Sequence, residues 1–360
     1  MTPSKTLAEI RDGIDSIDNE LIRLLNERAE LVHEVGQFKR SNGLEFYAPE
    51  REEALLQSLV DKSRGGRLPE ESIRAIYREV MSAALALEKD LVIAYLGPEA
   101  TWSHQAARGK FGASVKYAAQ PNIGDVFDQV TRRTADYGVV PIENSTEGAV
   151  NHTLDVFMDS DLKICAQILQ PIENNLIGRI PRETIRRIYS HPQVFGQCRQ
   201  WLRMNFPTVE TIEVSSTTRA AELAAASDDA VAIAGKMAAE VYHLDILEPA
   251  IQDTATNTTR FLVIGHKTCP PTGNDKTSIM FSIDDSVGAL FSALEPFKHF
   301  KINLTKIESR PSKRKAWEYF FFVDVTGHCE DPTLIDALDE LRKHCTFVKI
   351  LGSYPNNIPD

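Results

Sequence analysis

Apolar residues recur every three or four positions through the first 90 residues of the chain. Residues 7–40 contain no proline, and their isoleucine, leucine, valine and phenylalanine side chains follow one another at alternating spacings of four and three. This period predicts one long amphipathic helix. Pro49 and Pro69 begin two further helical stretches, and the glycine pair at 65–66 ends the first of these. The N-terminal region is therefore predicted to be all helical.

The predicted first helix is too long for its neighbours to cover. About 34 residues at 1.5 Å each give a length on the order of 50 Å. Two shorter helices leave part of the apolar stripe exposed to water. We therefore expect a second copy of the chain to cover the remainder, in an intertwined dimer.

From residue 91 the pattern changes to short apolar runs with strong strand propensity, separated by helical stretches. The runs are LVIAYLG, YGVVPI, AVAIAG and RFLVIG, and they predict an α/β domain with a mainly parallel sheet. A Pro/Gly/Asn cluster at 270–274 marks a boundary. The elements after it follow the order βαββαβ of a ferredoxin-like fold. We expect a multidomain chain with an all-α domain (1–91), an α/β domain (92–272) and an α+β domain (273–360).

Composition and charge argue against several classes of function. The 360 residues carry a net charge of −11, which argues against a nucleic-acid partner. The apolar runs are too short to span a membrane, and the N-terminus lacks the pattern of a secretory signal. The five cysteines are scattered and form no CxxC pair, which favours a cytoplasmic protein with neither a disulfide framework nor a zinc site. Without a glycine-rich phosphate loop or a metal-ligand cluster, we expect no cofactor and no metal.

Cations interrupt the apolar seam of the first predicted helix. Arg28 occupies a position that the period reserves for a core residue, so it needs an anion, a carboxylate partner such as Glu52 or an exposed head group. Lys39 lies eleven residues further on and returns to nearly the same face. Arg51 can close the resulting groove with Glu52. Arg11 is seventeen residues before Arg28, so it can serve such a groove only from a second copy of the helix.

These cations carry a resemblance. The positions Arg11, Arg28, Lys39, Arg51 and Glu52 are similar to those of the helical chorismate mutase domain of bacterial bifunctional P-proteins. The resemblance implies rearrangement of chorismate, a dianion, to prephenate without proton transfer. It further implies that Arg28, with Arg11 from the second subunit, holds the carboxylates, while Lys39 stabilises charge on the ether oxygen.

The same resemblance includes three departures from the enteric pattern, at Ala48, Ala84 and Glu88. Ala48 replaces an Asp, and Ala84 replaces a Ser in the substrate site. Glu88 replaces a Gln that faces the ether oxygen, and it is expected to act in catalysis with Lys39. Because only a protonated carboxyl can donate a hydrogen bond, mutase activity is expected to fall as pH rises.

Five strings rich in hydroxyl and amide residues mark the α/β domain: GPEATWS (97–103), PIENSTEG (141–148), SHPQVFGQC (190–198), SSTTRAA (215–221) and NTTRF (257–261). Each alone is compatible with simple helix capping. Together they favour a ligand site where strands end and helices begin. The five strings resemble prephenate dehydratase over about 92–268. This implies two lobes like those of a periplasmic binding protein, with the active site in the cleft between them.

That resemblance also implies the reaction and its residues. Prephenate loses its ring hydroxyl and a carboxylate to give phenylpyruvate, CO₂ and water, so a proton donor beside the hydroxyl is needed. Thr259 of the TRF motif is assigned this role. The residues expected to bind and orient prephenate are Glu143, Asn144, Ser145, His191, Ser216, Thr217, Thr259, Arg260 and Phe261.

The last segment, about 276–354, resembles an ACT regulatory domain through GALFSAL (288–294) and ESRP (308–311). A helix start at Gly288 and a strand end at Pro311, as in any ferredoxin-like domain, are the simple structural explanation of these strings. The resemblance implies L-phenylalanine sensing between two such domains, through Gly288, Ala289, Leu290, Glu308, Ser309, Arg310 and Pro311. Because such a site lies between two ACT domains, we expect a homodimer or a dimer of dimers.

Two alternatives for the whole chain remain: a dehydratase whose helical domain only dimerises, and a non-catalytic amino-acid sensor.

Overall fold

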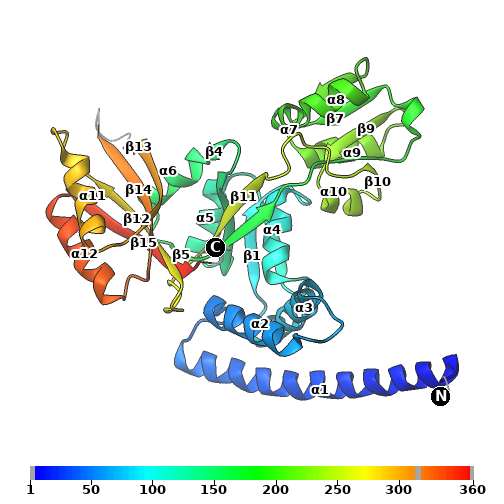
Figure 1. Cartoon of the computed structure of the whole chain (residues 1–360), viewed down its shortest axis with the longest axis horizontal. Coiled ribbons are helices and arrows are strands. Elements are labelled where there is room, and N and C mark those ends of the chain that lie inside the picture. Colours follow the sequence, from blue (N-terminus) through cyan, green and yellow to red (C-terminus); the bar gives the residue numbers. More distant parts are fainter. Residues whose placement is uncertain (1–4, 313–317, 357–360) are drawn as a thin grey trace. The chain divides into compact units, whose positions relative to one another are not determined.

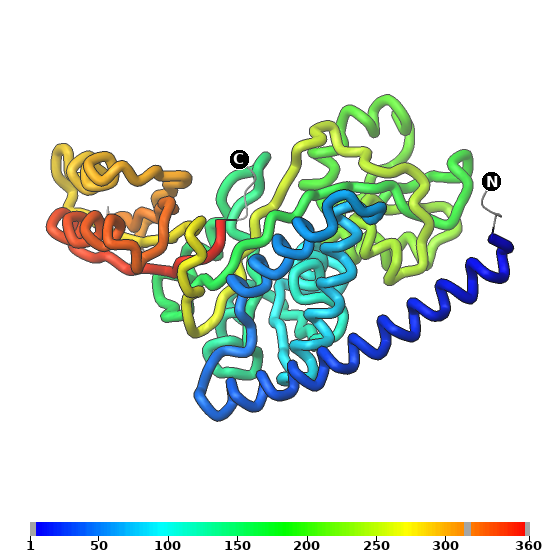
Figure 2. Tube along the Cα trace, turned by 60° about the horizontal axis from the view of Figure 1, so that its bottom comes forward, coloured from blue at the N-terminus to red at the C-terminus, as the bar shows by residue number. Residues whose placement is uncertain are grey.

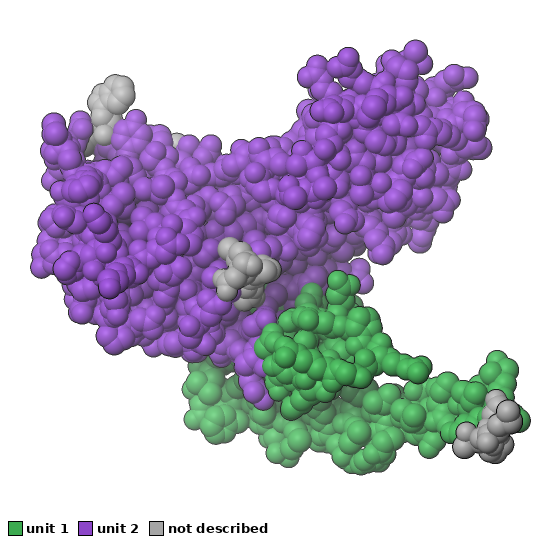
Figure 3. Space-filling model, viewed as in Figure 1, with its two compact units in different colours: residues 1–48, 55–91, 111–116 green, residues 49–54, 92–110, 117–360 purple. Residues whose placement is uncertain are grey.

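The computed structural model describes residues 5–312 and 318–356, and the chain divides into two compact units. Unit 1 comprises residues 1–48, 55–91 and 111–116, and unit 2 comprises residues 49–54, 92–110 and 117–360 (Figure 3). The outer ends of the first and third expected domains, 1–4 and 357–360, lie outside the described residues. Among the described helices, none has the length and apolar character needed to cross a membrane.

Unit 1 is helical, as predicted. It contains α1 (Leu7–Asn42), α3 (Glu70–Glu88) and most of α2 (Pro49–Ser63) (Figure 1). A capping box between Thr6 and Glu9 begins α1, and Gly43 ends it in the left-handed conformation at φ 63°. Gly36 of α1 is buried against α3, and a Cβ atom at this position would lie only 3.2 Å from the Cα atom of Glu88. The two helices therefore approach closely near the C-terminal end of α1.

The apolar stripe of α1 remains open to solvent. Eight of the residues that define the heptad-like spacing are between 46% and 63% exposed. They are Ile10, Ile14, Ile17, Leu21, Leu24, Leu31, Val35 and Phe38. Side chains of this size are normally buried. The cover that the sequence predicts from a second copy stays a prediction.

The first lobe of unit 2 is built on a sheet with strand order β2-β1-β3-β11-β5, and β4 pairs with β3. Its strands are β1 (Val92–Leu96), β2 (Lys116–Gln120), β3 (Tyr137–Asn144), β4 (Gly148–Ala149), β5 (Lys163–Pro171) and β11 (Thr258–Gly265). Its helices are α4 (Trp102–Phe111), α5 (Ile123–Thr131) and α6 (Asn151–Asp159).

The second lobe has the strand order β10-β6-β9-β7-β8. The strands are β6 (Asn175–Gly178), β7 (Arg187–Ser190), β8 (Glu210–Glu213), β9 (Ala230–Ala234) and β10 (Asp245–Glu248). The helices are η1 (Arg182–Thr184), α7 (Pro192–Gln197), α8 (Arg199–Asn205), α9 (Thr217–Ala225) and α10 (Lys236–Val241).

Two segments connect the lobes, one leaving after β5 and one returning before β11 (Figures 1 and 2). They lie side by side, since the Ile172 amide donates to the Asn257 carbonyl. The returning strand β11 inserts antiparallel between β3 and β5. The pairs β1/β3, β7/β8 and β7/β9 are parallel, whereas β6 runs antiparallel to β9. The expectation of a mainly parallel sheet is therefore wrong, because a chain that returns from the second lobe enters the first sheet from its opposite end.

The third part of unit 2 has the predicted order βαββαβ. Its elements are β12 (Asp275–Ser282), α11 (Ala289–His299), β13 (Leu304–Pro311), β14 (Tyr319–Thr326), α12 (Pro332–Lys343) and β15 (Phe347–Pro355). The strand order β13-β14-β12-β15 and the antiparallel pairing confirm the ferredoxin-like fold. Strand β13 forms one edge of this sheet.

This third sheet shares a hydrophobic core with the first lobe. One cluster of buried side chains joins Ile164 and Leu262 of the first lobe to Met280, Phe322 and Tyr354 of the third sheet. A glycine permits this docking, because a Cβ atom at position 352 would lie 2.1 Å from a carbonyl oxygen of β5. The ferredoxin-like sheet is thus packed directly onto the lobe that carries β11.

Candidate active sites in the two units

Unit 1 contains a cavity of about 280 Å³ between α1 and α3. Arg28 and Ala84, two of the predicted site residues, lie in its wall. Glu79 also lines it, and this carboxylate was not singled out in the sequence. The remaining lining residues are Leu25, Ala29, Val80, Ala83 and Leu87. The cavity therefore combines an apolar wall with one cation and one anion.

The predicted catalytic pair of unit 1 is in direct contact. Lys39 Nζ donates to the carboxylate of Glu88 at 2.7 Å and to the carbonyl of Phe46 at 2.8 Å. The two paired side chains are only 17% and 8% exposed. An ammonium group has three hydrogens to donate, so one remains for a substrate oxygen. A substrate that needs more from Lys39 must displace Glu88.

Neither Lys39 nor Glu88 is among the residues that line this cavity. Three further predicted mutase residues are not brought to it within unit 1 either. Arg11 lies near the start of α1 and is exposed. Arg51 and Glu52 belong to the first turn of α2, which is part of unit 2. Glu52 forms an ion pair of 3.3 Å with Lys110 of α4. Their predicted place beside a bound substrate stays a prediction.

A cavity of about 330 Å³ lies between the two lobes of unit 2. All five hydroxyl-rich strings contribute to its lining, and the predicted residues among them are Asn144, His191, Ser216, Thr217, Thr259 and Phe261. Thr101, Trp102 and Ser103 also line it, from a string whose single residues were not assigned a role. Of the described residues that line this cavity, none is Lys, Arg, Asp or Glu. Uncharged polar residues and apolar side chains therefore form most of this wall.

Thr259 lies in this cavity with its hydroxyl oriented by a neighbour. Asn144 Nδ2 donates to Thr259 Oγ1 and to Asn257 Oδ1, both at 2.8 Å. The side-chain Oδ1 of Asn144 accepts from the backbone amide of Thr146, which fixes the orientation of the Asn144 side-chain amide. Because Thr259 Oγ1 accepts this bond, its own hydrogen remains available to a molecule in the cavity.

The orienting network extends to residues that sequence reasoning did not single out. Asn257 Nδ2 donates to the side-chain oxygen of Gln197 at 3.2 Å, and Asn174 Nδ2 donates to the same oxygen at 3.0 Å. Asn257 and Gln197 stand inside two of the five strings, so the strings located them without showing their partners. These side-chain amides link the two segments that connect the lobes, beside Thr259.

Two cavity residues are helix caps as well. His191 Nδ1 accepts from the Gln193 amide at 3.3 Å, and Ser216 Oγ accepts from the Arg219 amide at 3.0 Å. His191 and Ser216 therefore cap helices and line the cavity at the same time. The first turn of α9, beginning at Thr217, supplies backbone donors at the cavity wall.

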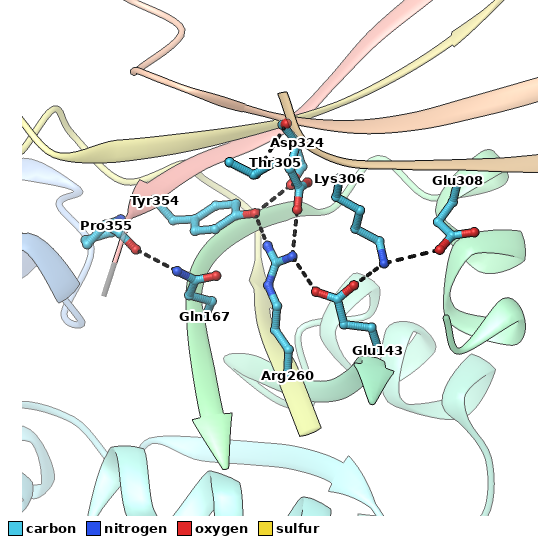
Figure 4. Close-up of polar contacts among 10 residues, drawn as sticks. Glu143, Gln167, Arg260, Thr305, Lys306, Glu308, Asp324, Tyr354 and Pro355 are labelled. Carbon is cyan, nitrogen blue, oxygen red and sulfur yellow. Dashed lines mark hydrogen bonds and ion pairs between the residues drawn. The ribbon is translucent and has the colours of Figure 1, made fainter. Parts of the chain in front are cut away.

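Three predicted substrate ligands lie elsewhere. Arg260 is 5% exposed, and its guanidinium donates to Asp324 at 2.6 Å, Tyr354 at 2.7 Å and Glu143 at 3.0 Å (Figure 4). Ser145 Oγ donates to the carbonyl of residue 256 and accepts from the amide of residue 258. The expectation that Glu143, Ser145 and Arg260 line the substrate cavity is not met. Alternation along the strands turns the neighbours of Thr259 and Asn144 to the opposite face.

The electrostatics of this second cluster are set by its burial and its opposite charges. Burial raises the pKa of Glu143, but hydrogen bonds and charges from Lys306 and Arg260 outweigh burial and lower it below 4.5. Burial, followed by the charge of Asp324, raises the pKa of Tyr354. At neutral pH, Glu143 is thus an acceptor and Tyr354 keeps its hydroxyl hydrogen.

The predicted effector residues lie on α11 and β13. Gly288 precedes α11 at φ 82°, a conformation that favours glycine, and Ala289 and Leu290 follow in the first turn. The ESRP string, Glu308 to Pro311, ends β13. Arg310 makes a bidentate contact with Asp155 of α6, at 2.9 and 3.1 Å. Glu308 lies 3.7 Å from Lys306.

Fold and sites together define an enzyme with two centres, one helical and charged, the other two-lobed and neutral, joined to a ferredoxin-like domain. Family models match in the same order: chorismate mutase type II at residues 10–89, prephenate dehydratase at 93–269 and the ACT domain at 277–343. The chain belongs to the bifunctional chorismate mutase/prephenate dehydratase family.

Individual relatives agree over the whole chain. The bifunctional chorismate mutase/prephenate dehydratase of Aquifex aeolicus is 49% identical over 353 residues, covering 97% of this chain and 98% of its own. The Neisseria gonorrhoeae protein of the same name is 45% identical, covering 99% of both chains. The crystal structure of prephenate dehydratase from Arthrobacter aurescens in complex with L-Phe matches with a TM-score of 0.69 and 32% identity. It covers 74% of this chain and 90% of the other. These matches favour a bifunctional enzyme over the two alternatives.

Proposed function

We propose that the helical segment 1–91 rearranges chorismate to prephenate and that segment 92–272 converts prephenate to phenylpyruvate. Segment 273–360 regulates the second step. The observation that carries the proposal is the cavity between the lobes, where Asn144 orients Thr259 amid all five strings. The site needs no cofactor, because the product's aromaticity drives the second reaction.

In the mutase step, static charges suffice. Chorismate rearranges through a cyclic transition state in which the ether bond breaks as the new carbon–carbon bond forms. Arg28, with Arg11 from a second copy of the chain, holds the two carboxylates in the reactive conformer. Lys39 stabilises negative charge on the ether oxygen, and Glu88 lies beside it. Arg51, Glu52 and Ala84 complete the substrate set.

In the dehydratase step, a proton must reach the leaving hydroxyl. The ring carboxylate leaves as CO₂, its bonding electrons enter the ring, and the carbon–oxygen bond to the hydroxyl breaks. The departing oxygen takes one proton and becomes water, so one proton is consumed. Thr259 donates that hydrogen and regains one from solvent, since Asn144 already occupies its oxygen as an acceptor.

The neutral cavity wall orients prephenate by hydrogen bonds. Backbone donors at the start of α9, with Ser216 and Thr217, suit a carboxylate. His191 is placed to bind a second polar group, and Phe261 to contact the ring face. This division leaves Glu143, Ser145 and Arg260 to support the site from outside the cavity.

L-Phenylalanine acts as a feedback inhibitor at Gly288–Leu290 and Glu308–Pro311. Backbone donors at the start of α11 suit the amino acid's carboxylate, and Glu308 suits its ammonium group. The solved relative whose name includes L-Phe supports this ligand. Calorimetric titration of the full chain with L-phenylalanine tests the assignment. Glu308→Gln should weaken binding, whereas exposed Lys301→Gln should not.

The enzyme functions in the cytoplasm as a homodimer or a dimer of dimers. The exposed stripe of α1 supports this, because a second copy packed on it would bury the residues from Ile10 to Phe38. It would also bring Arg11 to the other copy's cavity. Light scattering over a dilution series measures the mass. A Leu24→Glu variant should dissociate and lose mutase activity, and an active monomer would contradict the shared site.

One assay tests the central proposal. Purified full-length protein is given chorismate and then prephenate, while loss of chorismate and appearance of phenylpyruvate are followed. Both conversions are expected. Prephenate turnover without chorismate turnover would indicate a helical dimerisation module, and neither conversion would indicate a sensor.

A further inference from the structure

Two neighbouring positions on β3 and β11 present different pairs of residues to the two faces of one sheet. In the strand register, Thr259 lies opposite Asn144, and Arg260 lies opposite Glu143. The first pair lines the cavity between the lobes. The second pair faces the four-stranded sheet β13-β14-β12-β15 of the ACT domain, which we call the ACT sheet, as Figure 4 shows. Any displacement of Arg260 along or across β11 therefore moves the adjacent Thr259.

The ACT sheet holds Arg260 in a closed ring of hydrogen bonds. One nitrogen of the guanidinium donates to Asp324 on β14, and the other donates to Tyr354 on β15. Ser278 on β12 closes the ring, since its hydroxyl donates to Asp324 at 2.5 Å and lies 2.6 Å from the Tyr354 hydroxyl. Three strands of the ACT sheet thus contribute to one contact with β11.

Because this ring of hydrogen bonds is buried, its members tolerate little displacement. Arg260 and Asp324 are each 5% exposed, and Tyr354 is completely buried. A buried guanidinium that loses a partner keeps its charge without compensation, so it must follow the partner's position. The Nε atom of Arg260 has no hydrogen-bond partner, and the two terminal nitrogens therefore fix the group.

Local strand irregularity increases the need for such an anchor. The pairing of β11 with β3 shifts register between Arg260 and Phe261. A bulge there disrupts the β3 ladder directly beside Arg260, while β11 stays in register with β5 through residues 258–263. The hydrogen bond from Asn144 to Thr259 joins a register pair that precedes the shift.

From this arrangement we propose that Asp324 and Tyr354, two residues of the ACT sheet, are positioning residues for prephenate dehydration. They hold Arg260 on one face of β11 so that Thr259 and Asn144 keep their orientation on the other. Arg260 is a structural link to the ACT sheet and does not bind prephenate. The proposal rests on the role assigned to Thr259.

Asp324→Asn and Tyr354→Phe in the full chain test it, because the first removes the negative charge that pairs with Arg260 and the second removes the hydroxyl that accepts from it, each while nearly conserving shape. Dehydratase kcat should fall about 10- to 100-fold, the scale of a small misplacement of a catalytic group. The KM for prephenate should stay within about twofold, since the residues that line the cavity other than Thr259 and Asn144 keep their positions. Mutase activity should be unaffected. Should Asp324→Asn fail to fold, Tyr354→Phe alone decides.

Two comparisons separate positioning from general weakening of the contact between the ACT sheet and the first lobe. Lys349→Met removes another such contact, the hydrogen bonds from Lys349 to the carbonyls of Phe157 and Ser160, and should leave kcat unchanged. In a Thr259→Ala background, Tyr354→Phe should cost no further activity, because no hydroxyl remains to be positioned.

Normal kcat in both variants would overturn the inference, and so would a raised KM at constant kcat or fully additive losses with Thr259→Ala. Those results leave the proposed function intact. Near-normal turnover in Thr259→Ala itself would instead overturn the proposed role of Thr259, and with it this inference.

Discussion

The two proposed catalytic centres of this chain place their charges in opposite ways. In unit 1, Arg28 and Glu79 line the cavity and Lys39 lies paired with Glu88. In unit 2, the cavity wall is neutral and the charged residues Arg260, Glu143 and Asp324 lie behind it. A rearrangement without proton transfer needs fixed charges beside the substrate. A dehydration needs one correctly oriented hydrogen-bond donor. Charged residues therefore contribute more by holding that donor in position from behind the cavity than by lining the cavity.

Thr259→Ala should produce the largest difference between the two centres. Dehydratase kcat is expected to fall about 10²- to 10⁴-fold, the range of a lost proton donor, while chorismate turnover stays normal. Steady-state assays of both reactions on one preparation measure this. Thr211→Ala on β8, an exposed threonine of the second lobe, is the matched control. Retention of near-normal prephenate turnover would remove Thr259 from the mechanism.

Lys39→Ala should give the reverse pattern, with a somewhat smaller loss. Removing one group that stabilises transition-state charge costs about 10²- to 10³-fold in mutase kcat, and dehydration should be untouched. Exposed Lys62→Ala on α2 controls for loss of a positive charge. Equal losses of both activities in a folded variant would contradict the separation of the centres.

Glu143→Gln tests whether charge behind the neutral cavity supports the fold of unit 2. Its lowered pKa means that ionised Glu143 stabilises the folded state above its usual pKa of 4.5, and that this contribution is lost as pH falls through the lower, folded-state value. At pH 7 the variant should lose about 1.5–3 kcal/mol in free energy of unfolding. The difference from wild type should shrink below pH 4.5.

Urea unfolding of the full chain at successive pH values measures this difference. Exposed Glu210→Gln on β8 serves as the control. A difference that is constant with pH, or that grows in acid, would show that Glu143 does not act through its charge.

Glu88→Gln should have the smallest effect and concerns charge inside the mutase centre. An amide donates a hydrogen bond at every pH and does not neutralise Lys39, whereas an ionised carboxylate can only accept. Mutase kcat/KM of the variant should be about tenfold higher than that of the wild type, the value of one hydrogen bond of about 1.4 kcal/mol. Steady-state kinetics with chorismate measure the ratio, and an unchanged or lower kcat/KM would exclude this role for Glu88.

Patterns that depend on local spacing could be predicted from the sequence. The period of apolar residues located α1, and the turn strings located the cavity of unit 2 and the residues Asn144 and Thr259. These signals are local because helix periodicity and strand-to-helix turns are set by neighbours along the chain.

Features that depend on distant partners could not be predicted. Arg260 stands next to Thr259 in the TRF string, but its partner Asp324 is 64 positions away. Only the pairing of β11 between β3 and β5 decides which face each residue occupies. For the same reason the mixed sheet was missed, since nothing local shows that a strand returns antiparallel. Glu79, a carboxylate that lines the cavity of unit 1, had no distinguishing spacing at all.

The core shared by the ACT sheet and the first lobe has a consequence for how the chain can be divided. Ile164 and Leu262 contact the same buried cluster as Met280 and Tyr354, so cutting the chain near residue 272 would expose both sides. Segments that share a core unfold together. The first lobe and the ACT sheet are therefore expected to unfold as one unit, and a first lobe expressed without the ACT domain is expected to be insoluble.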